Sequence, residues 1–128
     1  NKFQNKKNNI LDGRLYIWRT VIKETKLFGY GRDYFAKFGL GAHNTFIIIL
    51  GQYGLFPLLF FILFLIMLLI KEYKYVQQTN DDGYKYLYLF ALISFILLSI
   101  GEGMMLKTSM ILMFSTIGFI DMSKLNRN

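Results

Sequence analysis

His43 and the arginines in the first third of the chain are the side chains best suited to carry out chemistry. His43 is the single histidine among 128 residues, and an imidazole can exchange protons near neutral pH. Arg14 and Arg19 each present a planar guanidinium, which stays charged and can bind phosphate oxygens with two hydrogen bonds. A simpler interpretation makes His43 an interfacial polar residue and leaves both arginines in contact with solvent or lipid phosphate. Residue type and spacing leave both interpretations open.

Chemistry that depends on thiols, on cysteine metal sites or on several histidines is excluded. The chain has no cysteine, which rules out disulfides, thiol nucleophiles and cysteine metal sites, and one histidine cannot form a multi-histidine site. Gly29 and Gly31 begin like a dinucleotide-binding fingerprint, but Tyr34 stands where the third glycine belongs. We therefore expect neither a metal nor a cofactor.

Three apolar segments must hold the reactive residues in place. Residues 45–70 and 86–100 carry no charge, and a third apolar segment runs from about 104 to 120, with Lys107 near its start. The first segment is long enough to cross the ~30 Å hydrocarbon core of a bilayer, and Pro57 should kink it. The sequence thus predicts an all-α, integral membrane protein with three transmembrane helices.

Polar residues separate these segments. Residues 71–85 form a polar connection, with a turn signal at 80–83. Residues 101–103, Gly-Glu-Gly, break the apolar pattern between the second and third segments. Glu102 therefore places a carboxylate at a membrane boundary, where we expect it to pair with Lys107 or with a basic residue of the N-terminal segment.

The segment before the first span predicts an amphipathic helix. Asp12 or Gly13 could cap a helix that runs from Arg14 to about Leu27. One face would carry an apolar stripe flanked by basic side chains, the stripe comprising Leu11, Leu15, Trp18 and Ile22 and the flank Arg14, Arg19, Lys23 and Lys26. Such a helix either lies in the membrane interface or packs on its own protein. The glycines between residues 29 and 41 predict an irregular loop after it.

The positive charge is concentrated in the same segment. Residues 1–43 hold nine basic and three acidic side chains, whereas residues 44–128 hold six and five. A basic segment beside apolar spans indicates a partner such as anionic membrane lipid or a phosphorylated substrate, and argues against nucleic acid. The loops on the two sides carry nearly equal numbers of Lys and Arg, so charge alone does not fix the orientation.

Several of these features recur in one order. Gly13, Arg14 and Trp18 are followed by Leu-Phe-Gly-Tyr-Gly at 27–31, by Ala-His-Asn-Thr-Phe at 42–46, and by Gly54 at the first span. This order resembles the C-terminal region of the O-antigen ligase and O-antigen polymerase family over about residues 13–70. Only 28 residues separate Arg14 from His43, fewer than in many ligases.

The resemblance implies a multi-pass enzyme of the bacterial cytoplasmic (inner) membrane, of which this chain would be a C-terminal fragment lacking the earlier helices. Residues 1–43 would be an extracytoplasmic loop segment with the amphipathic helix. Residues 44–128 would be a three-helix transmembrane segment of a larger polytopic domain. Other polysaccharide assembly proteins are further expected partners.

The resemblance also implies a metal-independent, inverting glycosyltransferase. Family members transfer glycans from an undecaprenyl-diphosphate carrier to an acceptor hydroxyl. Arg14 would hold the diphosphate. His43 would take the proton of the acceptor hydroxyl or orient that hydroxyl. Five further residues are expected to contact substrate: Arg19, Arg32, Asn44, Tyr30 and Glu102.

Four functions remain open at this level. A polymerase would extend surface polysaccharide or capsule repeat units, and an O-antigen ligase would attach the finished glycan to a lipid core. The many Lys, Asn, Ile, Phe and Tyr residues indicate an AT-rich genome. Several organisms with such genomes lack a lipopolysaccharide core that a ligase could use, which favours the polymerase. A transporter of lipid-linked sugars and a non-enzymatic membrane anchor are the alternatives without glycosyl transfer.

Overall fold

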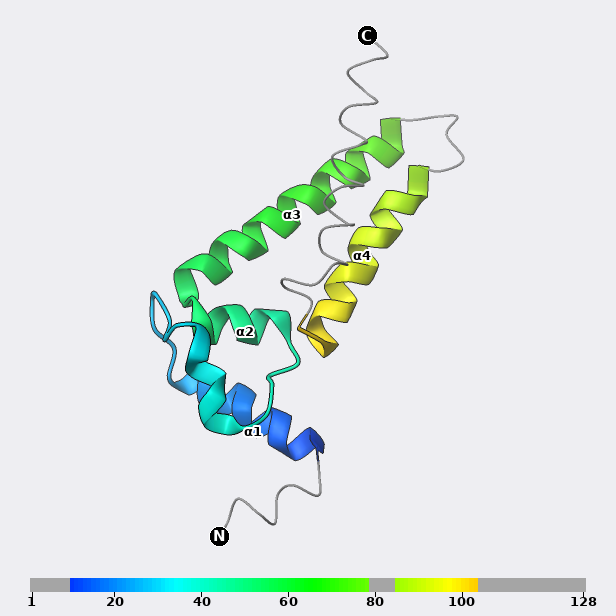
Figure 1. Cartoon of the computed structure of the whole chain (residues 1–128). Helices are drawn as coiled ribbons and strands as arrows, with labels where there is room; N and C mark the ends of the chain where they lie inside the picture. The colour runs from blue at the N-terminus through cyan, green and yellow to red at the C-terminus, as the bar shows by residue number, and fades with distance from the viewer. Residues whose placement is uncertain (1–9, 79–84, 104–128) are drawn as a thin grey trace.

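The computed structural model describes residues 10–78 and 85–103, in which the regular elements are all helices and no strand is present. The elements in chain order are α1 (Ile10–Lys23), the 3-10 helix η1 (Arg32–Phe38), α2 (Thr45–Gln52), α3 (Leu55–Gln78) and α4 (Lys85–Gly101) (Figure 1). The expected all-α class is therefore confirmed for this part of the chain. The expected third span, Lys107 and the turn at 80–83 lie outside the described residues.

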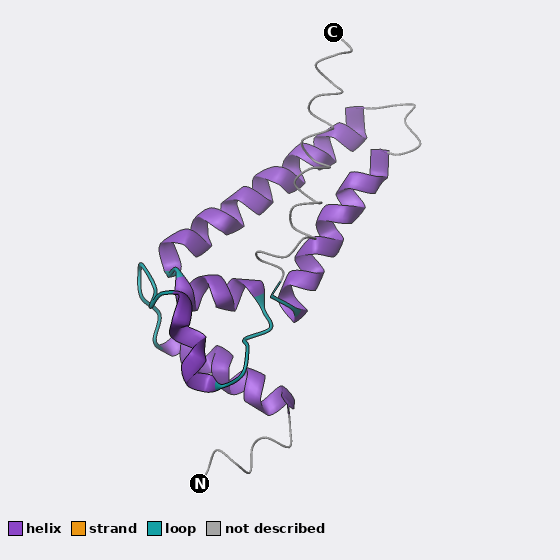
Figure 2. Cartoon of the chain, in the orientation of Figure 1, coloured by secondary structure: helices purple, strands orange, loops and turns teal. Residues whose placement is uncertain are grey.

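The helices form two groups. α3 and α4 run antiparallel as a pair, while α1 and η1 gather around α2 at one end of that pair (Figures 1 and 2). Leu65 and Leu68 of α3 pack with Leu92 and Phe95 of α4 in the core of the pair. α2 contacts every other element and therefore joins the two groups.

α1 packs on its own protein through Trp18 of the predicted stripe and through two residues that the stripe did not include. Ile17 and Val21, one helical turn apart, are each only 2% exposed and join a core cluster with α2 and η1. Leu15 and Ile22 of the predicted stripe are 44% and 59% exposed. The predicted bounds are also wrong, because the helix begins at Ile10 and ends at Lys23. The apolar residues of α1 thus cover two faces, one buried and one open.

The loop expected after α1 is more regular than its glycines suggest. Residues 32–38 form η1, whose Tyr34 is buried and packs with Phe35 and Phe38. Gly39 ends the element in the left-handed region at φ 64°. The aromatic side chains supply a local core that overrides the irregularity predicted from the glycines.

The first predicted span is two helices rather than one. α2 ends at Gln52, and Gly54, at φ 101°, redirects the chain into α3. Pro57 causes no kink because it lies in the first turn of α3, where a backbone N–H has no partner within the helix. The prediction of a continuous segment over 45–70 kinked at Pro57 is therefore wrong.

The segment after α1 completes the hydrogen bonds of this break. The N–H groups of Leu55 and Phe56 donate to the carbonyls of Lys26 and Leu27, at 2.9 and 3.1 Å. In return, the N–H groups of residues 30 and 31 donate to the carbonyls of Gly51 and Gln52, at 3.0 and 2.9 Å. The end of α2 and the start of α3 are thus satisfied by protein backbone, which an apolar environment requires.

α3 continues well beyond its apolar part. Residues 71–78, expected as part of a polar connection, form its last two turns. Glu72 and Val76 are buried there, while Lys74 is exposed. The connection was predicted from polarity alone, but these residue types are also good helix formers.

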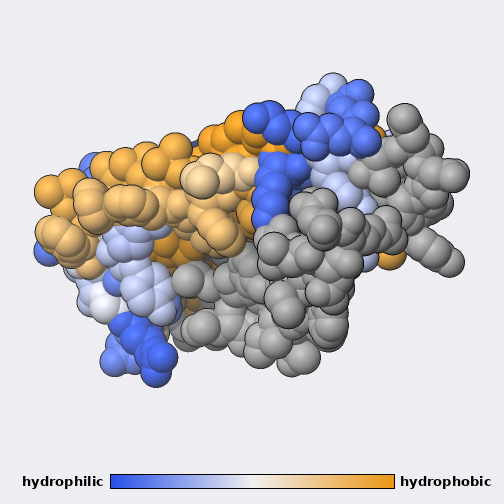
Figure 3. All heavy atoms as spheres, turned by 90° about the horizontal axis from the view of Figure 1, so that it is seen from above, coloured by the Kyte–Doolittle hydropathy of each residue, from blue (hydrophilic) through white to orange (hydrophobic). Residues whose placement is uncertain are grey.

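One helix of the described residues, α3, is long and apolar enough to cross a membrane. Its outward side carries exposed residues such as Phe60, Leu63 and Met67. Apolar atoms form a broad band on one side of the molecule and give way to hydrophilic ones toward one end (Figure 3). α4 is apolar but has 17 residues, which is short for a span.

Candidate functional site

His43 lies directly before α2 and faces the end of α4. Its Nδ1 is 3.2 Å from Oε2 of Glu102, although the two residues are 59 positions apart in sequence. Both side chains are partly accessible, at 40% and 47% exposure. The structure therefore brings together two of the predicted site residues and gives Glu102 a described partner that the sequence analysis did not name.

The contact with Glu102 engages Nδ1 of His43 and leaves Nε2 as the other ring nitrogen. When Glu102 is ionised, its carboxylate only accepts hydrogen bonds, so in that state Nδ1 of His43 is the hydrogen-bond donor. In the neutral ring, Nε2 then holds the free lone pair. An ideal Cβ on Gly41 would lie 3.4 Å from this Nε2. A glycine at position 41 thus leaves room beside the basic nitrogen.

The backbone of His43 is held in an uncommon conformation. Its φ of 47° makes it the single non-glycine residue with positive φ among the described residues. This conformation costs roughly 1–3 kcal/mol for a side chain that does not favour it, and persists where neighbours enforce it. Such strain is frequent at functional sites.

The two residues after His43 are held by hydrogen bonds to α2 and to the end of α4. Asn44 caps α2 by accepting a 3.0 Å hydrogen bond from the N–H of Ile47, and its Nδ2 donates to the carbonyl of Ile100. The Oγ1 of Thr45 donates to the carbonyl of Glu102 at 3.1 Å. Both side chains are buried. Asn44, expected as a sugar contact, is therefore engaged in fastening α2 to the end of α4.

α1 supports the same loop from the other side. The indole Nε1 of Trp18 donates a 2.7 Å hydrogen bond to the carbonyl of Ala42, the residue before His43. Arg14 lies four residues earlier and thus on the same face of α1, one turn away. The side chain of Arg14 is half-buried, and no hydrogen bond or ion pair of its guanidinium is present within the described residues.

Arg19 and Arg32 are exposed and make no ion pair with the described residues. Arg32 begins η1, and its carbonyl accepts a 2.9 Å hydrogen bond from Nε2 of Gln52. Among the described residues, no hydrogen bond or ion pair joins either guanidinium to His43. Their predicted role in diphosphate binding stays a prediction.

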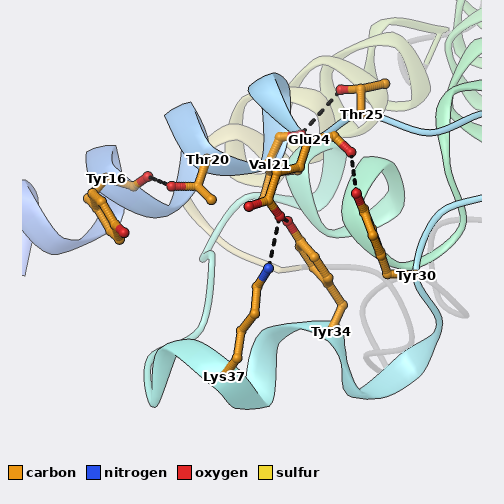
Figure 4. A network of polar contacts seen from close by, with 8 residues as sticks. All are labelled: Tyr16, Thr20, Val21, Glu24, Thr25, Tyr30, Tyr34 and Lys37. Carbon is orange, nitrogen blue, oxygen red and sulfur yellow. Dashed lines mark hydrogen bonds and ion pairs between the residues drawn. The ribbon is translucent and has the colours of Figure 1, made fainter.

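Tyr30 belongs to a separate polar network built on Glu24. Lys37 and Tyr34 extend from η1 toward the carboxylate of Glu24, at 2.9 and 2.8 Å, and the hydroxyl of Tyr30 donates to the carbonyl of Glu24 (Figure 4). The Tyr30 ring stacks on Tyr34 with centroids 4.7 Å apart, and the ammonium of Lys26 lies 4.2 Å from its centroid. These contacts fasten η1 to the end of α1. Both the hydroxyl and the ring of Tyr30 are therefore engaged in contacts within this segment.

The network shifts three pKa values. Hydrogen bonds from Lys37 and then Tyr34 lower the pKa of Glu24. The hydrogen bond to Glu24 raises the pKa of Lys37. Burial, followed by the bond to Glu24, raises the pKa of Tyr34. The charged pair and the neutral phenol are thus the favoured forms at neutral pH.

Within residues 10–78 and 85–103, no group of three or more potential ligands is placed to hold a metal ion. Trp18, Thr45 and Gly41 support the site but were not predicted to do so, because each acts through a contact distant in sequence or through the absence of a side chain. The preference of Asn for helix N-caps could have identified the capping role of Asn44.

No family model, curated protein or solved structure is significantly similar to the chain.

Proposed function

We propose that this chain belongs to a membrane glycosyltransferase that polymerises surface polysaccharide repeat units from an undecaprenyl-diphosphate carrier. The observation that carries the proposal is the pairing of His43 with Glu102 beside the open position of Gly41. A half-exposed imidazole with one nitrogen held by a carboxylate, on a strained backbone, is an arrangement suited to general-base catalysis.

The reaction needs one proton acceptor and one anion-binding group. The acceptor hydroxyl attacks the anomeric carbon of the donor sugar, its proton passes to Nε2 of His43, and the bond from that carbon to the diphosphate oxygen breaks. Attack from the side opposite the leaving group inverts the anomeric centre. Glu102 stabilises the imidazolium that forms and keeps Nδ1 in its donor role.

Arg14 is the proposed partner of the diphosphate. The leaving group departs as an anion, so it requires charge neutralisation, which a guanidinium provides through two parallel hydrogen bonds. The placement of Arg14 on the Trp18 face of α1, and the lack of a described acidic partner, support this role. The protein would act in the bacterial inner membrane, with α3 as one of its spans.

The experiment is a transfer assay on the full-length protein in proteoliposomes, with an undecaprenyl-diphosphate-linked repeat unit as donor. We expect longer lipid-linked glycans, released undecaprenyl diphosphate, and inversion at the new linkage. Addition of a chelator should leave the rate unchanged. Movement of the intact donor across the bilayer without a new glycosidic bond would identify a transporter and overturn the proposal.

A further inference from the structure

The most exposed aromatic side chain of the described residues has no role in the proposed reaction. Phe28 is 78% exposed, and Leu27 beside it is 62% exposed. Both lie in the segment that completes the break between α2 and α3. A backbone that is fixed by four hydrogen bonds thus presents two large apolar side chains outward.

Phe28 is continuous with the apolar surface of α3. Its ring lies 6.2 Å from that of Phe56, which in turn lies 4.9 Å from Phe60, centroid to centroid. Phe56 and Phe60 are 51% and 59% exposed. We call Leu27, Phe28, Phe56 and Phe60 the corner patch. It extends the outward side of α3 beyond the N-terminus of that helix.

The charge around the corner patch is basic. Lys23 and Lys26 are exposed just before it, and Arg19 is exposed one turn earlier on α1. The nearby carboxylate of Glu24 is occupied by Lys37 and Tyr34. Aromatic side chains beside uncompensated Lys and Arg are typical of surfaces that lie at the boundary between lipid headgroups and acyl chains.

We infer that the corner patch is a membrane anchor that inserts Leu27 and Phe28 into the headgroup boundary of an anionic lipid bilayer. The inference rests on the membrane placement of α3 in the proposed function, and is independent of the glycosyl transfer. The anchor would fix the depth in the membrane of the break between α2 and α3. It would thereby also fix the depth of α1, η1 and α2, and of His43 beside α2.

The test measures the depth of three single labels in the full-length protein, reconstituted in vesicles containing phosphatidylglycerol. Nitroxides are attached at Phe28→Cys, at Leu63→Cys in the middle of α3, and at Asp33→Cys on exposed η1; this chain has no cysteine of its own. Collision with oxygen, which concentrates in lipid, is compared with collision with a water-soluble nickel complex.

We expect a deep label at position 63, an aqueous one at position 33 and a label near the headgroup boundary at position 28. An aqueous label at position 28 with a deep label at 63 overturns the anchor alone. A label at 28 shielded from both reagents also overturns it, because protein would then cover the patch. Aqueous labels at both 28 and 63 overturn the membrane placement of α3 together with the anchor.

Discussion

Nδ1 of His43 and Oε2 of Glu102 lie 3.2 Å apart, and this contact joins the start of α2 to the end of α4. The hydrogen bonds of Asn44 and Thr45 to the same end of α4 fix the two partners relative to each other. The pair is thus held by side-chain hydrogen bonds to backbone carbonyls, and these do not depend on the ionisation of His43 or Glu102. Its chemistry can be altered without dismantling the loop.

Glu102→Gln tests the carboxylate separately from the contact. Glutamine can still accept the Nδ1–H bond but cannot stabilise the imidazolium by charge. We expect the turnover number of transfer to fall about tenfold or more, with little change in KM for the donor, as for the orienting carboxylate of a catalytic histidine. Steady-state kinetics in proteoliposomes give both values. Asp33→Asn, an exposed change of the same type, should leave them unchanged; equal effects of the two variants would remove Glu102 from the mechanism.

Gly41→Val tests the space beside Nε2 of His43. The new side chain would begin 3.4 Å from that nitrogen and crowd the approach of the acceptor hydroxyl. We expect transfer to fall at least tenfold while the melting temperature in detergent stays close to that of the parent, since a misplaced reactant costs about that much or more. Gly101→Val is the control, because nothing lies within 4 Å of a Cβ at that position. Full activity of Gly41→Val would show that Nε2 is not approached from this side.

Gly29→Ala and Gly54→Ala test the junction of the two helix groups. A Cβ on Gly29 would lie 2.5 Å from the carbonyl oxygen of Gln52, and one on Gly54 would clash with the backbone of Leu27 and Gly29. Both glycines also have positive φ, at 67° and 101°. We expect each variant to lose more than about 2 kcal/mol of stability, measured by thermal or denaturant unfolding in detergent.

Gly31→Ala is the matched control for this junction. It has a positive φ of 92°, but nothing lies within 4 Å of its Cβ position. With ψ at 175° it lies in a backbone region essentially restricted to glycine, so its expected loss is the conformational cost alone, roughly 1–3 kcal/mol and smaller than the losses of Gly29→Ala and Gly54→Ala. Equal losses in all three variants would mean that the close approach of Gly29 and Gly54 does not hold the junction.

The Glu24 network predicts a pH dependence of the η1 loop. Because the pKa of Glu24 is lower in the folded protein than its ordinary value of 4.5, its stabilising contribution is complete above that value and is lost as pH falls through the lowered pKa. The pKa of Lys37 is raised above 10.5, so its contribution is lost only as pH rises through that raised value. Amide hydrogen exchange of residues 32–38, corrected for the intrinsic rate, should show protection that decreases on acidification. Glu24→Gln should be less protected at neutral pH and should lack this decrease; an unchanged profile would contradict the network.

The elements that could be predicted from sequence are those with strong local signals. α4 matches the apolar segment 86–100 to within one residue at each end, because Gly101 and Gly103 interrupt the pattern there. The break at Gly54 was missed because it lies within a continuous apolar run, and its signal resides in the segment 26–31 that packs against it. A kink was predicted at Pro57 instead, although the start of a helix tolerates proline without distortion.

The candidate site was predictable only as a set of residue types. His43, Arg14 and Glu102 were identified as groups capable of chemistry, but no local pattern relates His43 to a residue 59 positions away. The buried face of α1 was misassigned for a similar reason. Ile17 and Val21 are buried because they pack against α2, which is a tertiary contact. The predicted stripe was assigned from helical spacing alone, and its Leu15 and Ile22 are exposed.

The most direct measurement of the central claim is the rate of glycosyl transfer by His43→Gly, with and without added imidazole. Glycine accepts the φ of 47° without strain, so this variant removes the base while keeping the loop. Loss of general-base catalysis should lower the rate by about 100-fold or more, and imidazole in solution should restore part of it in proportion to its concentration. A His43→Gly protein that transfers glycan at the parental rate would contradict the assignment of His43 as the base.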